Sequence, residues 1–196
     1  PEQAPYPLPR SSYGIPTPNC DGLTNYGSAT SGGEIYEGIY TKIKLSNGSL
    51  HFNPGLYCVT GGPDAIKITG GQVTGEGVTI YVIQGNVSIS GNVEPVDLAA
   101  PLRGSKPARA IEGLLIYLAD GNTSEVNMEG NSNTKYYGTI YAPDGDIVLT
   151  GANNTSPTFN TQLIGNNVDV GGNVDLQIVF NDYHNALIHA SMQLFR

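Results

Sequence analysis

Acidic side chains are the residues of this sequence most able to support chemistry, because clustered carboxylates perform acid/base catalysis and bind calcium. The candidates are Glu129, Asp144, Asp146, Asp169 and Asp175. Polysaccharide lyases and hydrolases place such groups close together, usually with a basic residue on the same strand face. Here they are scattered, and no Asp-Asp, Gly-His-Gly or Arg-X-Lys motif occurs. Solvated turn residues are therefore the favoured interpretation, and no catalytic residue is predicted.

Calcium is the weak alternative for one acidic pair. Asp144 and Asp146 flank a glycine, as in a fragment of a calcium-binding loop, but the further ligands of an EF-hand are missing. A tight turn explains the same residues, so we predict no cofactor and keep Ca²⁺ at Asp144 and Asp146 as a minor alternative. The histidines share no metal-ligand spacing and are expected at the surface or in a cap: His51, His184 and His189.

Cys20 and Cys58 are the only two cysteines, and neither belongs to a Cys-X-X-Cys motif. Either they form a disulfide or they are two buried free thiols. The disulfide is favoured because the rest of the composition resembles that of secreted proteins. Such a bond would join the N-terminal region to the remainder of the chain, and it indicates an extracellular location.

Four tyrosines end apolar runs at recurring intervals. They are Tyr57, Tyr81, Tyr117 and Tyr141, and the first and last intervals between them are equal while the middle one is longer. If they point outward, they form an aromatic stripe that can stack on sugar rings or on a protein partner. If they point inward, they form a ladder in the core. A core or partly buried ladder is favoured, and the contact stripe remains open.

A repeated strand motif must position these residues. The pattern Val/Ile-X-apolar-X-Gly recurs and ends at Gly70, Gly91, Gly130, Gly151 and Gly172. The intervals between successive glycines are equal except the one from Gly91 to Gly130, which equals one repeat plus an insertion. The insertion is expected near residues 100–109, because insertions in stacked repeats project as loops without breaking the stack.

The repeat predicts an all-β fold. Apolar and polar residues alternate within each motif, as in strands with one buried side, and glycine permits the bends between strands. A period of about 21–24 residues suits three short strands per coil. We therefore predict a single-stranded right-handed parallel β-helix, or β-solenoid, of about 5–6 coils. A β-sandwich is the competing fold, but it does not require one residue type at a fixed spacing.

Three regions differ in composition. Residues 1–33 carry six prolines within the first eighteen positions and are predicted to form a Pro/Gly-rich arm or linker. Residues 34–181 hold the repeats. Residues 182–196 abandon the glycine period and are predicted to cap the C-terminal end, because an open parallel stack exposes strand edges.

Charge and hydropathy restrict the partners. Asp and Glu outnumber Lys and Arg by 17 to 9, the net charge is −8, and no basic run occurs, which argues against nucleic acid. No apolar stretch is long enough to span a bilayer. The chain begins with Pro1 rather than Met, so we expect a processed piece whose only link to a membrane is a removed N-terminal segment.

Several phrases of the sequence resemble a known family. They are Phe-Asn-Pro-Gly-Leu-Tyr-Cys (52–58), Gly-Glu-Gly-Val-Thr-Ile-Tyr (75–81), Gly-Thr-Ile-Tyr-Ala-Pro-Asp-Gly (138–145) and Thr-Gln-Leu-Ile-Gly-Asn-Asn-Val (161–168). These resemble the extracellular β-helical region of bacterial TadE/TadG-like pilus-assembly proteins, and the similarity covers roughly residues 50–180. The resemblance implies a role at the cell surface or in a pilus, and it supplies no catalytic residues.

The predicted function is that of an extracellular, non-catalytic structural or adhesive solenoid, associated with a surface or pilus and able to assemble into filaments. Its expected partners are other surface proteins or copies of itself, with glycans as a further candidate. The alternative is a carbohydrate-binding or polysaccharide-degrading β-helix.

Overall fold

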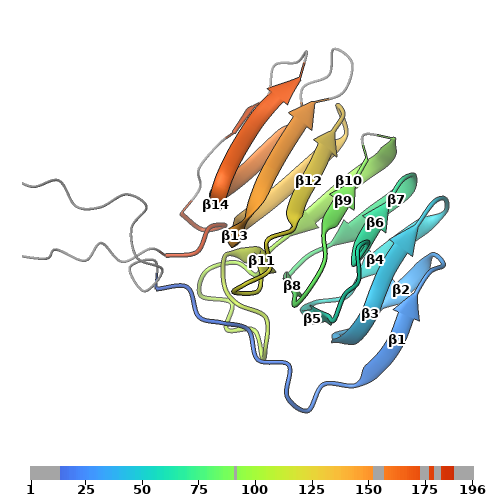
Figure 1. The fold of residues 1–196 in the computed structure, drawn as a ribbon, viewed down its shortest axis with the longest axis vertical. Coiled ribbons are helices and arrows are strands. Elements are labelled where there is room, and N and C mark those ends of the chain that lie inside the picture. The colour runs from blue at the N-terminus through green and yellow to red at the C-terminus, as the bar shows by residue number, and fades with distance from the viewer. Residues whose placement is uncertain (1–13, 91, 152–156, 173–176, 179–181, 188–196) are drawn as a thin grey trace, which may run out of the picture.

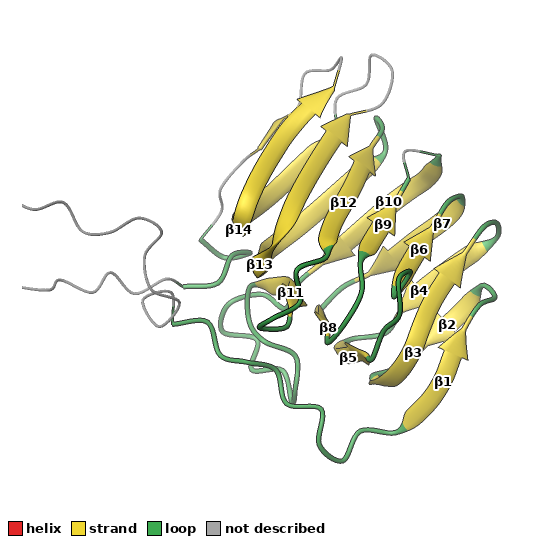
Figure 2. Ribbon diagram, in the orientation of Figure 1, coloured by secondary structure: helices red, strands yellow, loops and turns green. Residues whose placement is uncertain are grey.

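The computed structural model describes residues 14–90, 92–151, 157–172, 177–178 and 182–187. All regular structure within these ranges is β-strand, and the strands form one 15-stranded parallel sheet coiled into a solenoid of about six turns (Figures 1 and 2). The β-solenoid prediction is thus confirmed. The described residues contain no helix that is long and apolar enough to cross a membrane.

The strands stack into three faces, which we call A, B and C. Face A contains the second half of β3 (Gly38–Leu45), β6 (Ile66–Ile68), β9 (Val87–Ile89), β12 (Glu125–Gly130) and the ends of β13 (Thr134–Gly151) and β14 (Thr158–Gly172). Face B contains β2 (Gly33–Ile35), β4 (Ser49–Phe52), β7 (Gly71–Gly75), β10 (Val93–Ala99), the starts of β13 and β14, and β15 (Gln177–Ile178).

Face C contains the start of β3, β5 (Gly55–Val59), β8 (Val78–Val82), β11 (Leu114–Leu118) and the middle of β13 and β14. The remaining strand, β1 (Asn25–Ala29), pairs with β3 and begins the stack. The long strands β13 and β14 run continuously over all three faces. Each coil therefore passes face B, then face C, then face A.

The interior consists of apolar ladders. On face A, Ile43, Ile66, Val87, Val126 and Ile147 lie in one register column, and each is at most 1% exposed. Their neighbours along each strand point outward, so β6 and β9 alternate between buried and more accessible residues. This arrangement follows from the two-residue period of a strand with one buried side.

The glycine repeat corresponds to real strand register. Gly130, Gly151 and Gly172 pair directly across β12, β13 and β14. Gly70 ends the same column shortly after Ile68, which pairs with Ile89, while Gly91 lies outside the described residues. Gly172 has a φ of +113°, and a Cβ there would approach the Gly151 carbonyl oxygen to 2.7 Å. At Gly70 a Cβ would likewise lie 2.6 Å from the Ser46 carbonyl oxygen, so close stacking of backbone at the bend favours glycine at these two positions.

One extended connection interrupts the stack. β10 ends at Ala99 and β11 begins at Leu114, whereas residues 76–77 suffice to connect β7 to β8 at the same corner of the preceding coil. Residues 100–113 form this connection, which we call the inserted loop. It projects from the corner between faces B and C and leaves the pairing of β11 with β8 intact.

Candidate functional site: the covered tyrosines and the inserted loop

The outer side of face C carries a column of three tyrosines. Tyr81 pairs with Tyr117, and Tyr117 pairs with Tyr141. Ring centroids are 5.4 Å apart for the first pair and 4.8 Å for the second. Tyr117 and Tyr141 are only 2% and 3% exposed, although their side chains lie outside the solenoid core. Something other than the coils must therefore cover them.

Tyr57 does not belong to this column. It pairs with Ile80, and Cys58 takes the position opposite Tyr81. The Tyr57 ring points into the core, where the one proton of its hydroxyl is shared between the carbonyl oxygens of Asn53 at 2.7 Å and Ile35 at 2.9 Å. Burial raises the pKa of Tyr57 well above its ordinary value. Tyr57 is consequently a core residue, and the structure does not bring together all four spaced tyrosines.

The N-terminal arm covers the column. Within the described part of the arm, Ile15 packs against the tyrosine cluster, and Thr17 Oγ1 lies 3.5 Å from the Tyr117 hydroxyl. Ile111 of the inserted loop and Ile164 of β14 complete the cluster. These residues form a second, smaller apolar core on the outside of face C. Tyr81, Tyr117 and Tyr141 thus form a covered ladder on the outside of the coils rather than an exposed contact stripe.

A disulfide holds the arm in this position. Cys20 bonds to Cys58, and their Cα atoms are 6.1 Å apart. Because Cys58 occupies the tyrosine column one coil before Tyr81, the bond fixes the arm where it crosses the start of that column. The predicted disulfide is confirmed, and it is consistent with an extracellular location.

The inserted loop is internally tied. The Glu112 carboxylate accepts hydrogen bonds from the backbone N–H groups of Gly104 and Lys106, each at 2.9 Å. These bonds, the one from Gly104 first, lower the pKa of Glu112 because they stabilise its charged form. Arg109 Nη1 donates to the Asp21 carbonyl oxygen at 2.7 Å, which links the loop to the arm. The loop therefore has a defined shape and a defined partner.

Residues 182–187 reach the same region from the C-terminal side. The Tyr183 carbonyl oxygen accepts a hydrogen bond from the backbone N–H of Arg103 at 2.9 Å, and this bond joins the segment to the inserted loop. Asn185 Oδ1 accepts from the Gln162 N–H at 3.0 Å, and the Ala186 N–H donates to Thr139 Oγ1 at 2.8 Å. The rest of the predicted C-terminal cap, 188–196, lies outside the described residues, as do residues 1–13 of the arm.

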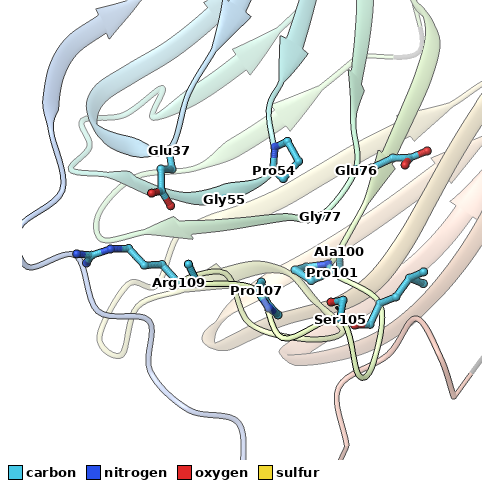
Figure 3. Close-up of a pocket in the computed structure, with 12 residues that line it drawn as sticks. Glu37, Pro54, Gly55, Glu76, Gly77, Ala100, Pro101, Ser105, Pro107 and Arg109 are labelled. Carbon is cyan, nitrogen blue, oxygen red and sulfur yellow. Dashed lines mark hydrogen bonds between the residues drawn. The ribbon is translucent and has the colours of Figure 1, made fainter.

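A groove lies between the inserted loop and the corner turns before β5 and β8 (Figure 3). Its volume is about 440 Å³. Pro54, Pro101 and Leu102 contribute apolar surface, while Glu37, Glu76 and Arg109 contribute charge. Leu102 is 50% exposed. An open groove with apolar walls and charged borders suits the side chains of a partner better than an enclosed small molecule.

The acidic candidates do not assemble into one site. Asp144 Oδ2 accepts from the Gly121 N–H at 2.6 Å, and Asp146 Oδ1 accepts from Asn166 Nδ2 at 3.2 Å. Asp169 lies on the outside of face A opposite Val148, and Asp175 lies outside the described residues. Across the described ranges, no three His, Cys, Asp or Glu side chains gather as metal ligands would. Asp144 thus accepts a hydrogen bond from the turn at Gly121, and Asp146 accepts one from the side chain of Asn166.

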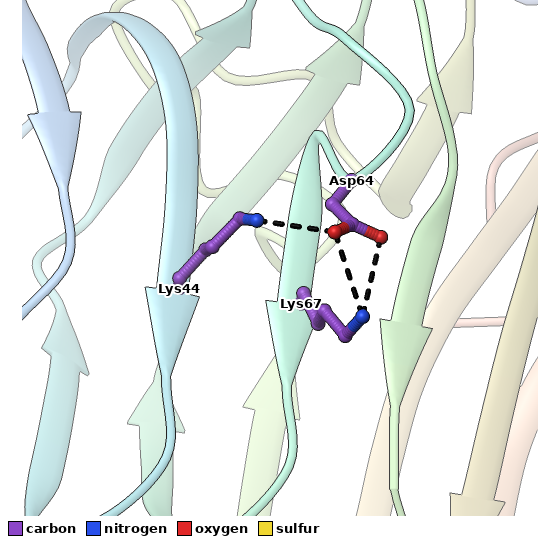
Figure 4. A network of polar contacts seen from close by, with 3 residues as sticks. All are labelled: Lys44, Asp64 and Lys67. Atoms are coloured by element: carbon purple, nitrogen blue, oxygen red, sulfur yellow. Dashed lines mark hydrogen bonds and ion pairs between the residues drawn. The ribbon is translucent and has the colours of Figure 1, made fainter.

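A small charge network lies on the outer side of face A (Figure 4). Asp64 Oδ2 is 3.1 Å from Lys44 Nζ and 3.4 Å from Lys67 Nζ. The hydrogen bond from Lys44 is the main reason why the pKa of Asp64 falls below its ordinary value. All three side chains are accessible to solvent, so the network contributes little to stability.

The covering of face C by the arm and the loop was not foreseen from the sequence. The sequence feature that could have indicated this covering is the apolar run Leu114–Leu118, in which all five residues are buried. A strand buried on one side alternates, whereas a continuous apolar run indicates burial on both sides.

Comparisons with curated proteins and with solved structures find no match to this chain. The model of the family described as "Domain of unknown function (DUF7305)" matches residues 28–187, so the chain belongs to that family.

Proposed function

We propose that this chain is an extracellular, non-catalytic structural or adhesive solenoid. In this role the stacked coils form a stiff spacer, and the region around the inserted loop makes the specific contacts. The observation that carries the proposal is the convergence of the arm, the inserted loop and residues 182–187 on one side of face C. Loops supported by a rigid scaffold commonly carry recognition.

The disulfide supports the extracellular part of the proposal, since such bonds persist in oxidising compartments. A surface or pilus-associated setting is supported by the resemblance of several sequence phrases to TadE/TadG-like proteins. The groove beside the inserted loop suits a protein partner, because Pro54, Pro101 and Leu102 offer apolar contact next to the carboxylates of Glu37 and Glu76.

The carbohydrate-active alternative has less support. Sugar stacking on the tyrosine column would need its rings to be accessible, but Tyr117 and Tyr141 are covered by the arm and the loop. Hydrolysis or lyase chemistry needs carboxylates that converge on one substrate. Asp144 and Asp146 instead bond to Gly121 and Asn166.

A polysaccharide-cleavage screen tests the non-catalytic part. The purified chain is incubated with neutral and acidic polysaccharides, and new reducing ends and unsaturated products are measured. We expect no turnover. Turnover that disappears in Asp144→Ala or Asp146→Ala would overturn the proposal in favour of an enzyme.

The location is tested separately in cells that express the native protein. The cells are lysed under conditions that trap free thiols. A thiol-reactive mass tag is then added, with and without prior reduction of the protein. We expect Cys20 and Cys58 to react only after reduction, and external protease to degrade the protein on intact cells. Free thiols in a protease-protected protein would contradict an extracellular location.

A further inference from the structure

The two ends of the solenoid differ in how their apolar columns are closed. Val168 and Val170 in β14 are each 41% exposed. Their counterparts in the preceding coil, Ile147 and Leu149, are 0% exposed and occupy the same inward columns. The last described coil of face A therefore presents to solvent the two inward columns that the coils from β3 to β13 bury.

The same coil has an open backbone edge. β14 pairs with β13 along most of its length, but β15 pairs only with Thr158 and Phe159. Along its face A part, from Asn167 to Gly172, no strand among the described residues lies on the other side of β14. Unpaired N–H and C=O groups on a parallel strand are a template for another strand.

At the opposite end the apolar columns are closed, because Ile43 and Leu45 are buried, but the backbone edge is open and its register is known. β1 ends at Ala29, which pairs with Ile43 of β3. Beyond that pair, Lys44 and Leu45 have no described strand on the N-terminal side. Ala29 is partly buried against the main core. An added strand on face A would thus meet Ala29 and then the edge of β3.

Charge also differs between the ends of face A. One outward column contains, in order, Lys44, Lys67, Ser88, Asn127, Val148 and Asp169. Its first two members are basic and its last member is acidic. Within one chain, Lys44 and Asp169 are five strand spacings apart, roughly 24 Å, which is too far for direct contact.

We propose that copies of this chain stack head to tail, with β14 of one copy on β1 and β3 of the next. This inference rests on the proposed structural function and names a second copy as the partner. With the columns continued across the junction, Val168 lies over Ala29 of the next copy. Asp169 then lies about two strand spacings, roughly 10 Å, from Lys44, close enough for the lysine side chain to reach toward the carboxylate.

Self-association of the 196-residue chain tests the proposal. Sedimentation velocity and light scattering are measured over a wide range of protein concentration. We expect the weight-average mass to rise steadily above the 20.6 kDa of one chain, without a preferred closed oligomer. A chain that stays monomeric throughout overturns the inference, as does a closed dimer that does not grow.

Substitutions at the exposed positions test which surface associates. Val168→Lys and Val170→Lys are each expected to weaken association by about tenfold, because they place a charge in an apolar junction. Their melting temperatures should stay close to that of the wild type. A chain that remains monomeric while Val168→Lys lowers its melting temperature would show that β14 is covered within its own chain, which also overturns the inference.

A charge exchange tests the register. Lys44→Glu and Asp169→Lys are each expected to weaken association severalfold, and the double variant is expected to restore it. Restoration cannot arise within one chain, because the two positions are too far apart. The control is Lys67→Glu, which also removes a contact with Asp64 but lies one coil inside the stack. Equal loss of association in the control, or no restoration in the double variant, contradicts the register.

The polysaccharide-cleavage and thiol-labelling experiments test the proposed function separately, because neither depends on assembly of the chain.

Discussion

Faces A and C are built from the same coils but are covered differently. On face A, β6 and β9 bury only their inward residues, and the outer side carries polar and charged groups such as Lys67 and Ser88. On face C, β11 is buried on both sides, because the arm and the inserted loop cover Tyr117. A solenoid strand can thus be either a one-sided or a two-sided core element, and its sequence shows which.

This difference between faces A and C also predicts where substitutions affect stability and where they affect the proposed contacts. Among the described residues, face A is held by the coils alone, whereas face C is held by the coils and by segments far apart in sequence, tied by one disulfide. Changes on face C should therefore affect both folding stability and the shape of the proposed recognition region around the inserted loop. Changes on the outside of face A should affect association between copies and little else.

The largest expected effect is loss of the disulfide. Replacing Cys20 and Cys58 by Ser should lower the free energy of unfolding by roughly 4 kcal/mol, because the bond joins residues with a sequence separation of 38. Urea unfolding measures the change, and reduction of the wild-type chain should give the same loss. A loss of less than about 1 kcal/mol would mean that the arm contributes no constraint to face C.

A matched pair of outward residues compares the two faces directly. Tyr117→Ala on face C should lower the unfolding free energy by about 3 kcal/mol, because it removes a buried ring from the second core. Asn127→Ala, at an outward position of the next strand on face A, should change it by less than about 0.5 kcal/mol. Urea unfolding of both variants provides the test, and equal effects would abolish the distinction.

A smaller effect is expected where the C-terminal segment meets the loop. Gly113 has a φ of +73°, and a Cβ there would lie 2.3 Å from the Asn185 carbonyl carbon. Gly113→Ala should therefore cost about 2 kcal/mol and expose residues 182–187 to protease. Gly104 has a φ of +83° with nothing within 4 Å, so Gly104→Ala is the control for backbone strain alone. Identical losses and identical proteolysis would argue against close packing of the segment on Gly113.

The smallest effect concerns Asp64 on face A. Its pKa should lie below the ordinary value of 3.8, mainly because Lys44 donates a hydrogen bond to it. A depressed pKa in the folded state means that the contribution to stability is present above pH 3.8 and is lost as the pH falls through the folded-state pKa. A carboxyl-carbon NMR titration should show the pKa rising in Lys44→Met. An unchanged pKa would contradict the contact.

Much of face A was predictable from the sequence. The alternation within each motif and the equal spacing of Gly130, Gly151 and Gly172 correspond directly to strand register. These features are local, because each strand repeats the same pattern and pairs with its copy in the adjacent coil. Period and alternation therefore suffice to predict the solenoid.

Face C was harder because a one-residue slip moves a side chain to the other side of the sheet. The spacing of the tyrosines would place Tyr57 opposite Tyr81, but the register of β5 on β8 is one position shorter and pairs Tyr57 with Ile80. Tyr57 therefore points into the core while Tyr81 points outward. The covering arm was not predictable from spacing, because its contacts join residues far apart in sequence without any repeat.

The most direct test of a covered face C is tyrosine footprinting by hydroxyl radicals with mass spectrometry. In the oxidised chain, Tyr117 and Tyr141 should be protected, while Tyr26, Tyr36 and Tyr183, which are 49%, 52% and 71% exposed, should react. In the variant lacking Cys20 and Cys58, Tyr117 should become reactive while the core residue Tyr57 stays protected. If Tyr117 and Tyr141 react as fast as Tyr183 in the oxidised chain, the arm does not cover face C.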